Sequence, residues 1–307
     1  MVLNISGATQ DYLANLDRTQ QQINQAQAEV SSGFRVQAPS DDPAAVPSIL
    51  EVQAEIGANQ QIQSNLGSVT NELGTADSAL QSAVQAVENA ITLALQGANS
   101  TATADERANI AQQVAGLQQT LVGISQTTVN GRYIFSGDQD GAPAYQLDSS
   151  QPEGVKQLIS APSTRVIVDA TGTAISVAKT AQELFDAKNS DGSPAAGNVF
   201  AAINSLLTAL NNNDQSGIAQ ASSALQSADT YLNQQLASYG EAENRIAAAT
   251  DLAQKFQTQQ KAQLGDLRDA DIPSVALQLS QAQLDQQAAL SAEANIEQSR
   301  NLFSYLG

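Results

Sequence analysis

Both ends of the chain carry apolar residues at the spacing of a coiled coil. Near the N-terminus two interleaved series recur every seven residues, namely Ile5, Tyr12, Thr19 and Ala26, and Leu16, Ile23 and Val30. Near the C-terminus a helical pattern rich in alanine and glutamine runs from about residue 218 to residue 306, and only Asp271-Ile272-Pro273 interrupts it. Heptad spacing places such side chains on one stripe of a helix, which a single helix cannot bury. Each end therefore needs a partner, either the other end or another copy of the chain.

The composition favours thin helical packing over a large globular core. Of the 307 residues, 4% are aromatic, one is methionine, and none is tryptophan, cysteine or histidine. Alanine and glutamine are abundant, and both form helices well but fill a core poorly. Without cysteine there are no disulfides or thiol nucleophiles, and without histidine the commonest general base and metal ligand are missing. We therefore expect a chain that is not an enzyme, with no catalytic residues, no cofactor and no metal site.

The charge balance argues against several partners. The chain has 13 Lys and Arg against 31 Asp and Glu, a net charge of −18. Phosphate neutralisation dominates nucleic-acid affinity, so we expect no nucleic-acid partner, and anionic membrane surfaces repel the chain for the same reason. No run of about 18 apolar residues predicts a transmembrane helix. The N-terminal residues lack the basic and apolar regions of a cleavable secretory signal.

A long helix is expected in the first third of the chain. From Ile62 to Ala94 apolar residues alternate spacings of four and three without a break, which is the pattern of a coiled coil. Asp41 or Asp42 can cap the start of this helix, and Pro43 suits its first turn. The helix is expected to end near Gly97.

A second helix is expected to follow directly. Thr103-Ala104-Asp105-Glu106 has the pattern of a capping box, and the same spacing continues from Ile110 to Ile124. The helix is expected to stop near Asn130-Gly131. Two long helices with a short connection pack antiparallel, so residues 41–131 are predicted to form a helical hairpin.

Between residues 132 and 197 the pattern changes to short β-type runs. These runs are Tyr133 to Phe135, Val155 to Ile159, Arg165 to Val168 and Ile175 to Val177. Glycine and proline residues separate them, as in turns. A short helix is expected near residues 181–188 and a loop near residues 190–197. The segment is predicted to be a small β-rich insertion.

Helical patterns return after the insertion and complete the predicted fold. The expected fold class is mainly α: a long antiparallel helical rod or coiled-coil bundle formed by the N- and C-terminal parts, with the β-rich insertion between them. Proline breaks the last helical pattern at Asp271-Ile272-Pro273. The predicted division is an N-terminal assembly helix over 1–40, the hairpin over 41–131, the insertion over 132–197, returning helices over 198–270 and a C-terminal assembly helix over 271–307.

Residues at the inner edges of the two terminal helices resemble a known family. Val30-Ser31-Ser32-Gly33-Phe34-Arg35-Val36, followed by Ser40-Asp41-Asp42-Pro43-Ala44-Ala45, looks like the N-terminal signature of flagellins and flagellar hook-associated proteins. The segment from Asp269 to Leu306 resembles the matching C-terminal segment. Flagellins tend to read Asp-Asp-Ala-Ala-Gly where this chain reads Asp-Asp-Pro-Ala-Ala. The segment from Asn130 to Gly137 is similar to the helix-to-β transition of the hook-associated proteins that join hook to filament.

The resemblance implies a structural role in the bacterial flagellum. It implies a non-enzymatic, extracellular subunit that is exported unfolded through the type III pathway without signal cleavage. Such a subunit self-associates in a ring or tube layer and joins hook-associated protein 1 to flagellin. A dedicated export chaperone would cover the C-terminal helix, with Leu284, Leu290, Ile296 and Phe303 as its contacts. The alternatives are a flagellin that forms the filament itself and, in a different class, a type III secreted coiled-coil tip or translocator protein.

The residues predicted to serve assembly lie on the terminal stripes and in the signature between them. The stripe residues are Tyr12, Leu16, Ile23, Val30, Leu279, Leu290, Ile296 and Phe303. In the signature, Arg35 is expected either to pair with Asp41, Asp42 or an acid of a neighbouring subunit, or to be a solvated loop arginine. For Asp41 and Asp42, helix capping is the alternative to a partner contact.

Overall fold

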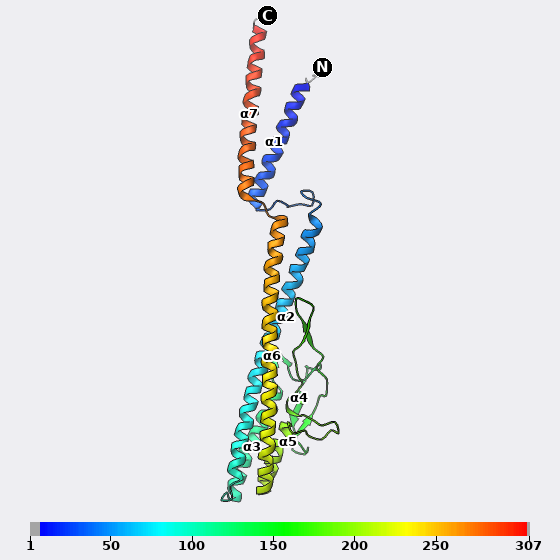
Figure 1. Cartoon of the computed structure of the whole chain (residues 1–307), viewed down its shortest axis with the longest axis vertical. Coiled ribbons are helices and arrows are strands. Elements are labelled where there is room, and N and C mark those ends of the chain that lie inside the picture. Colours follow the sequence, from blue (N-terminus) through cyan, green and yellow to red (C-terminus); the bar gives the residue numbers. More distant parts are fainter. Residues whose placement is uncertain (1–6, 306–307) are drawn as a thin grey trace. The chain divides into compact units, whose positions relative to one another are not determined.

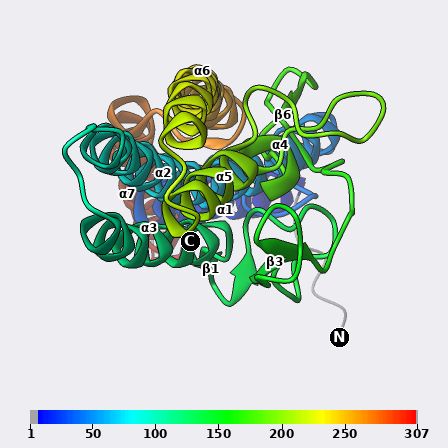
Figure 2. The same cartoon turned by 90° about the horizontal axis from the view of Figure 1, so that it is seen from below.

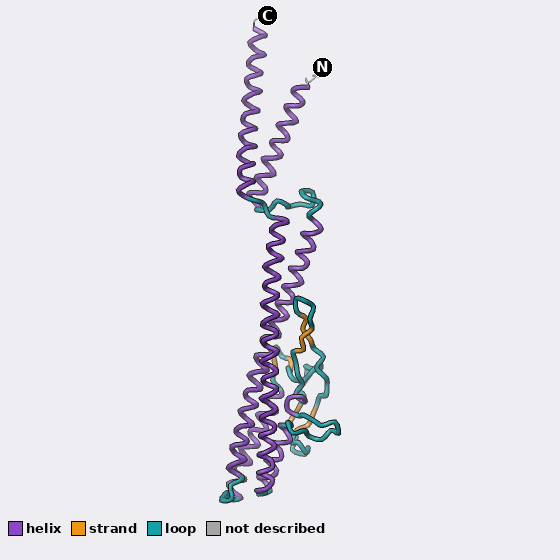
Figure 3. Tube along the Cα trace, viewed as in Figure 1, coloured by secondary structure: helices purple, strands orange, loops and turns teal. Residues whose placement is uncertain are grey.

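The computed structural model describes the backbone of residues 7–305 and the side chains of residues 10–294. Over this range the chain forms seven helices and six short strands (Figures 1 and 3). The helices are α1 (Gly7–Ser32), α2 (Val46–Gly97), α3 (Ala104–Ser125), α4 (Ala181–Phe185), α5 (Val199–Asn211), α6 (Gln215–Arg268) and α7 (Ile272–Tyr305). The strands are β1 (Thr128–Val129), β2 (Arg132–Tyr133), β3 (Tyr145–Leu147), β4 (Val155–Gln157), β5 (Val166–Val168) and β6 (Ala174–Ser176). The predicted fold class, mainly α with a small β-containing insertion, is confirmed.

The chain divides into two compact units. The terminal unit consists of Met1–Ala58 and Gln257–Gly307, and the middle unit of Asn59–Phe256. The boundary falls inside α2 and α6, so each of these helices contributes residues to both units. Over the described residues, no helix is both long enough and apolar enough to cross a membrane.

In the terminal unit α1 and α7 pack side by side and run antiparallel (Figure 1). Ile23 and Ala26 of α1 are buried, as are Val275 and Ala282 of α7. These positions follow the spacing of four and three that lets one helix stripe meet another. The prediction that the two ends of the chain are partners for each other is therefore confirmed over the described residues, while Ile5 lies outside them.

Four helices of different lengths build the core of the middle unit. Figure 2, which looks along them, shows α2, α3, α5 and α6 gathered around one another. The α2 stripe is nearly inaccessible to solvent at its leucines, with Leu66 and Leu80 each 0% exposed. Each leucine buried in this way contributes about 1.5–3 kcal/mol. The apolar stripe that begins at Ile110 on α3 was expected to pack against the stripe on α2. Instead, α3 makes its most extensive helix contacts with α5, and all four helices contribute side chains to one core.

The termini of α2 and α3 differ in how well the sequence predicts them. α2 begins at Val46 rather than at residues 40–43, and it ends at Gly97 as predicted. A side chain at Gly97 would collide with Leu210, whose Cδ2 lies 2.7 Å from the position of an added Cβ. α3 begins with the predicted capping box, in which the side chain of Thr103 accepts from the Glu106 amide and Glu106 accepts from the Thr103 amide.

The insertion contains three separate antiparallel ribbons of two strands each, β1–β2, β3–β4 and β5–β6. α3 ends at Ser125, so Asn130-Gly131 is not a helix stop but the two-residue turn between β1 and β2. Both turn residues have positive φ, 53° and 78°, which is the conformation that an Asn-Gly pair favours in tight hairpins. Strand β3 was not predicted. Its Tyr145 joins Phe135, Phe185 and Phe200 in an aromatic cluster with ring centroids 5.2–6.1 Å apart.

Candidate functional site

The family-like signature lies in the connection between α1 and α2, which is bonded to the short connection between α6 and α7. The amides of Arg35 and Val36 donate to the carbonyl of Arg268 at 2.8 and 3.2 Å. In return the amide of Ala270 donates to the carbonyl of Gly33 at 2.9 Å. We call residues 33–45 together with residues 267–271 the clasp. Because its bonds join residues more than 200 positions apart in the sequence, the clasp ties the N-terminal helix to the C-terminal one.

Gly33 begins the clasp because the backbone must turn there. Its amide donates to Glu29 at 2.8 Å, and its φ of 78° lies in the left-handed region. Residues with a side chain rarely adopt this conformation, and glycine is the usual residue just past a helix end. The glycine therefore ends α1 and directs the chain towards residue 269, where Phe34 and Asp269 form an isolated antiparallel β-bridge.

Arg35 joins three segments of the clasp. One guanidinium nitrogen lies 2.8 Å from the Asp42 carboxylate, and the other donates to the Leu267 carbonyl at 2.8 Å. A planar guanidinium can donate hydrogen bonds to two acceptors in fixed directions, whereas the ammonium group of a lysine has no such fixed geometry. The structure thus pairs Arg35 with Asp42, while the Arg35 side chain remains 44% exposed.

Asp41 and Asp42 organise the clasp itself. Asp41 accepts from the amides of Ala38 and Gln37 at 2.8 and 2.9 Å, and these bonds hold the pKa of its carboxyl below the usual value. The pKa of Asp42 is also lowered, first by Arg35 and then by the amide of Ala45. Asp42 caps the turn that precedes α2, and Pro43 lies in that turn rather than in the helix. Both carboxylates are therefore held in the charged form by local donors.

One contact in the clasp was not anticipated. The guanidinium of Arg268 lies 3.8 Å from the centroid of the Phe34 ring, a cation–π arrangement. The sequence carries both residues beside the family-like segments, but nothing in their spacing predicts that they meet across 234 positions (268 − 34). Among the described residues, no three His, Cys, Asp or Glu side chains come together as metal ligands would.

The predicted stripe residues fall into two groups. Ile23 is buried, and Tyr12, Leu16 and Leu279 are half-buried between α1 and α7. The hydroxyl of Tyr12 donates to the Ala289 carbonyl at 3.3 Å. Val30 and Leu290 instead lie on the surface, 38% and 52% exposed. Ile296 and Phe303 belong to α7, but their side chains lie outside the described residues.

The terminal unit has an apolar outer surface. Seven of the twelve exposed large hydrophobic residues in the described part of the chain belong to this unit, namely Leu13, Val30, Leu50, Ile272, Leu277, Leu284 and Leu290. Leu277 is the most exposed of them at 73%, and Leu284 is 58% exposed. Six of the seven lie on α1 and α7, and Leu50 lies on α2.

Comparison with known proteins places the chain in a family. Residues 3–140 match the family model of the bacterial flagellin N-terminal helical region, and residues 222–306 match that of the C-terminal helical region. The two matches together span most of the chain, and each contains one of the two segments of the clasp. The chain belongs to the flagellin superfamily. No curated protein sequence matches it.

Solved structures with a similar fold come from flagellar proteins. A Vibrio parahaemolyticus protein assigned as a flagellar hook-associated protein is 20% identical, with a TM-score of 0.65 over 75% of this chain and 100% of its own. The flagellar hook-associated protein 3 of Legionella pneumophila is 14% identical, with a TM-score of 0.62 over 71% of this chain and 98% of its own. A FlgL of Xanthomonas campestris is 17% identical, with a TM-score of 0.53 over 64% and 94% of the two chains. At these identities the similarity establishes the fold.

Proposed function

We propose that this chain is a structural subunit of the bacterial flagellum, the hook-associated protein 3 that joins the hook to the flagellin filament. The observation that carries the proposal is the terminal unit, where both flagellin-type ends fold together on the clasp and leave an apolar outer surface. Exposure of this apolar surface to water is unfavourable in a free subunit, and contact with neighbouring subunits in a layer would bury it.

The proposed interface consists of two kinds of residue. Ile23, Tyr12, Leu16 and Leu279 hold α1 and α7 together within one subunit. Val30 and Leu290 lie on the outer surface, where they contact neighbouring copies in a ring or tube. Arg35, Asp41 and Asp42 fix the conformation of the connection between α1 and α2. This connection orients the terminal helices that assemble. Ile296 and Phe303 extend the same interface towards the C-terminus.

The proposal includes partners and a route. The subunit is exported through the flagellar type III pathway without signal cleavage, and an export chaperone covers Leu284 and Leu290 of α7, which are exposed in the free chain. After export it binds hook-associated protein 1 on the hook side and flagellin on the filament side. The subunit acts outside the cell and performs no catalysis. The absence of cysteine from the sequence suits this export route, because no disulfide can form that would keep the chain folded before export.

A reconstitution experiment tests the junction role against the filament role. Purified protein is added to hooks that carry hook-associated protein 1 but end there, and flagellin monomers are added afterwards. A junction subunit adds one limited layer, visible by electron microscopy, and filaments grow only where that layer is present. Unlimited growth of the protein alone would identify it as a flagellin. Failure to add to hooks, together with binding to a needle-type secretion tip, would favour the tip or translocator class.

A further inference from the structure

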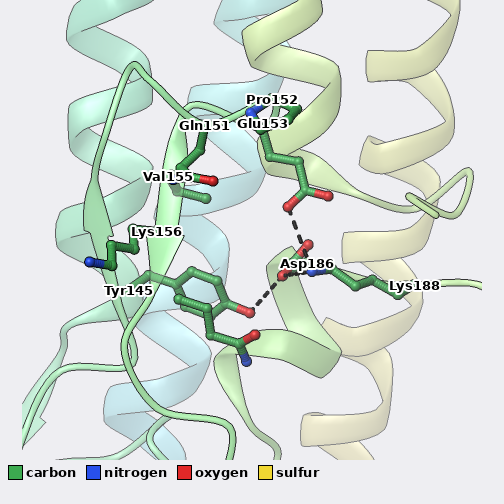
Figure 4. Close-up of a pocket in the computed structure, with 9 residues that line it drawn as sticks. Tyr145, Gln151, Pro152, Glu153, Val155, Lys156, Asp186 and Lys188 are labelled. Atoms are coloured by element: carbon green, nitrogen blue, oxygen red, sulfur yellow. Dashed lines mark hydrogen bonds and ion pairs between the residues drawn. The ribbon is translucent and has the colours of Figure 1, made fainter. Parts of the chain in front are cut away.

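A polar cluster in the middle unit lies outside the proposed assembly surface. Figure 4 shows a pocket beneath the loop between β3 and β4, where Tyr145, Glu153, Asp186 and Lys188 converge. The pocket is lined by the β3–β4 ribbon with its loop and by the residues that directly follow α4. None of these residues was singled out by the sequence pattern, because they come from three separate short segments.

Asp186 is the centre of the cluster. It is fully buried, and one carboxylate oxygen accepts from the Tyr145 hydroxyl at 2.7 Å while the other accepts from Asn198 at 2.8 Å. Lys188 supplies an ammonium 3.1 Å away. The carboxylate of Asp186 therefore has three polar partners, which are Tyr145, Asn198 and Lys188. Because Asn198 also caps α5, Asp186 joins β3, α4 and α5 at one point.

Glu153 brings a second carboxylate to the same ammonium. It belongs to the β3–β4 loop, and its carboxylate lies 3.8 Å from Lys188. Burial raises the pKa of Glu153, and the nearby Asp186 carboxylate raises it further. Lys156 also lines the pocket, but its side chain points away from Glu153 (Figure 4). The inner cluster of Glu153, Asp186 and Lys188 thus has one positive charge for two negative ones.

The loop that carries Glu153 is closely fitted to the helices beneath it. The carbonyl of Pro152 accepts from Asn204 of α5 at 2.9 Å. A Cβ at Gly154, whose φ is 71°, would come within 2.2 Å of Gln118 of α3. The loop is therefore held against α3 and α5, with Glu153 lining the pocket.

We propose that Glu153, Asp186 and Lys188 form a proton-linked latch that seats the β3–β4 loop more firmly as the pH falls. With Glu153 ionised, the seated loop brings a second negative charge beside Asp186. With Glu153 protonated, its carboxyl donates a hydrogen bond to Asp186, and Lys188 balances the remaining charge. Opening the loop returns Glu153 to water and to its ordinary proton affinity.

The sign of the pH effect follows from linkage. A carboxyl whose pKa is raised in the seated state binds its proton more tightly there than in the open state. The extra stability of the seated loop is therefore fully present below the ordinary pKa of a glutamate, about 4.3, and is lost as the pH rises through the raised pKa. The loop opens more readily at neutral pH.

Amide hydrogen exchange of the full chain tests the latch. Exchange of residues 148–157 is followed by mass spectrometry from pH 5 to pH 8 and corrected for the intrinsic pH dependence of exchange. Over this range, protection of the loop in the natural protein should fall by about tenfold for each pH unit by which the pKa of Glu153 in the seated state exceeds 5. In Glu153→Gln, protection should be independent of pH and at pH 8 should equal or exceed that of the natural protein at pH 5.

The controls separate the latch from an ordinary ion pair. Glu243→Gln, a matched substitution on α6, should leave the loop's pH dependence unchanged. Lys188→Gln removes the shared ammonium and should widen the difference in loop protection between pH 5 and pH 8. If Glu153→Gln instead lowers protection at every pH, the Glu153–Lys188 ion pair holds the loop and the proposal is wrong. A natural protein whose loop protection is flat across this range would also overturn it.

Discussion

The terminal and middle units use the same helical spacing but bury it to different extents. In the middle unit Leu66 and Leu80 of α2 are completely covered, because α3, α5 and α6 share their core. In the terminal unit α1 and α7 have each other as partners, and Leu277 remains 73% exposed. Two packed helices can bury one apolar stripe on each helix, whereas a helix in a group of four can bury a wider part of its surface. The difference predicts that the middle unit provides most of the stability of the free chain, and it supports the proposal that neighbouring subunits cover the terminal unit.

The largest effect is expected from the middle core. Leu80→Ala should lower the free energy of unfolding by about 2–5 kcal/mol, since a fully buried leucine leaves a cavity that the surrounding helices fill incompletely. Urea unfolding followed by circular dichroism measures the change. A cost under about 1 kcal/mol would mean that the core of the middle unit is loosely packed and that the contrast between the units is wrong.

The matched control is Leu277→Ala in α7. Because this leucine is mostly exposed, its loss should change the unfolding free energy of the free chain by no more than about 0.5 kcal/mol. It should nevertheless weaken layer formation on hooks, since the exposed side chain belongs to the proposed interface. A stable variant that assembles normally would remove Leu277 from that interface.

A smaller loss is expected at the start of α3. Thr103→Ala removes the side chain that accepts from the Glu106 amide, and the loss of such a cap typically costs about 0.5–2 kcal/mol. Thr103→Ser keeps the hydroxyl and should restore most of the stability in the same urea titration. Equal losses in both variants would show that packing of the threonine methyl group, and not the cap, stabilises this end of the middle unit.

A substitution in the clasp is expected to change amide exchange only near the clasp. Arg35→Lys keeps the charge but cannot reach both Asp42 and the Leu267 carbonyl with the same geometry. Amide exchange at Val36 and Ala270 should become faster, with little change in the middle unit. If exchange of the middle unit rises equally, the two units unfold together and the comparison between them fails.

The smallest effect should be a gain of stability. Asp229 on α6 has one buried carboxylate oxygen with no hydrogen-bond partner, and burial together with Glu88 raises its pKa. Its folded pKa exceeds the unfolded value of about 3.9, so the middle unit gains stability as the pH falls through that folded pKa. Asp229→Asn should stabilise the protein slightly at pH 7 and reduce this pH dependence in thermal unfolding. A less stable variant would show that the carboxylate has a favourable role.

The prediction from sequence succeeded where a pattern is local and long. The α2 stripe, the capping box at Thr103 and the break before α7 all depend on neighbouring residues, so spacing alone identifies them. The prediction failed at Asn130-Gly131, which was expected to end α3 but forms the turn between β1 and β2. It also missed β3, because three residues are too few to show a periodic pattern. On α7 the predicted Leu290 is exposed while Ala282 is buried, because the facing stripe of α1 decides which side is covered.

The helical class, the need of both ends for partners and the family-like segments beside them can all be recognised in the amino-acid sequence. These follow from periodicity and from residue types, which require no knowledge of distant contacts. The tertiary structure alone decided that Arg35 chooses Asp42 and the Leu267 carbonyl, that Phe34 lies against Arg268, and that Glu153 and Asp186 share Lys188. Such pairings depend on how segments far apart in the chain pack, and a one-dimensional pattern carries no information about that packing.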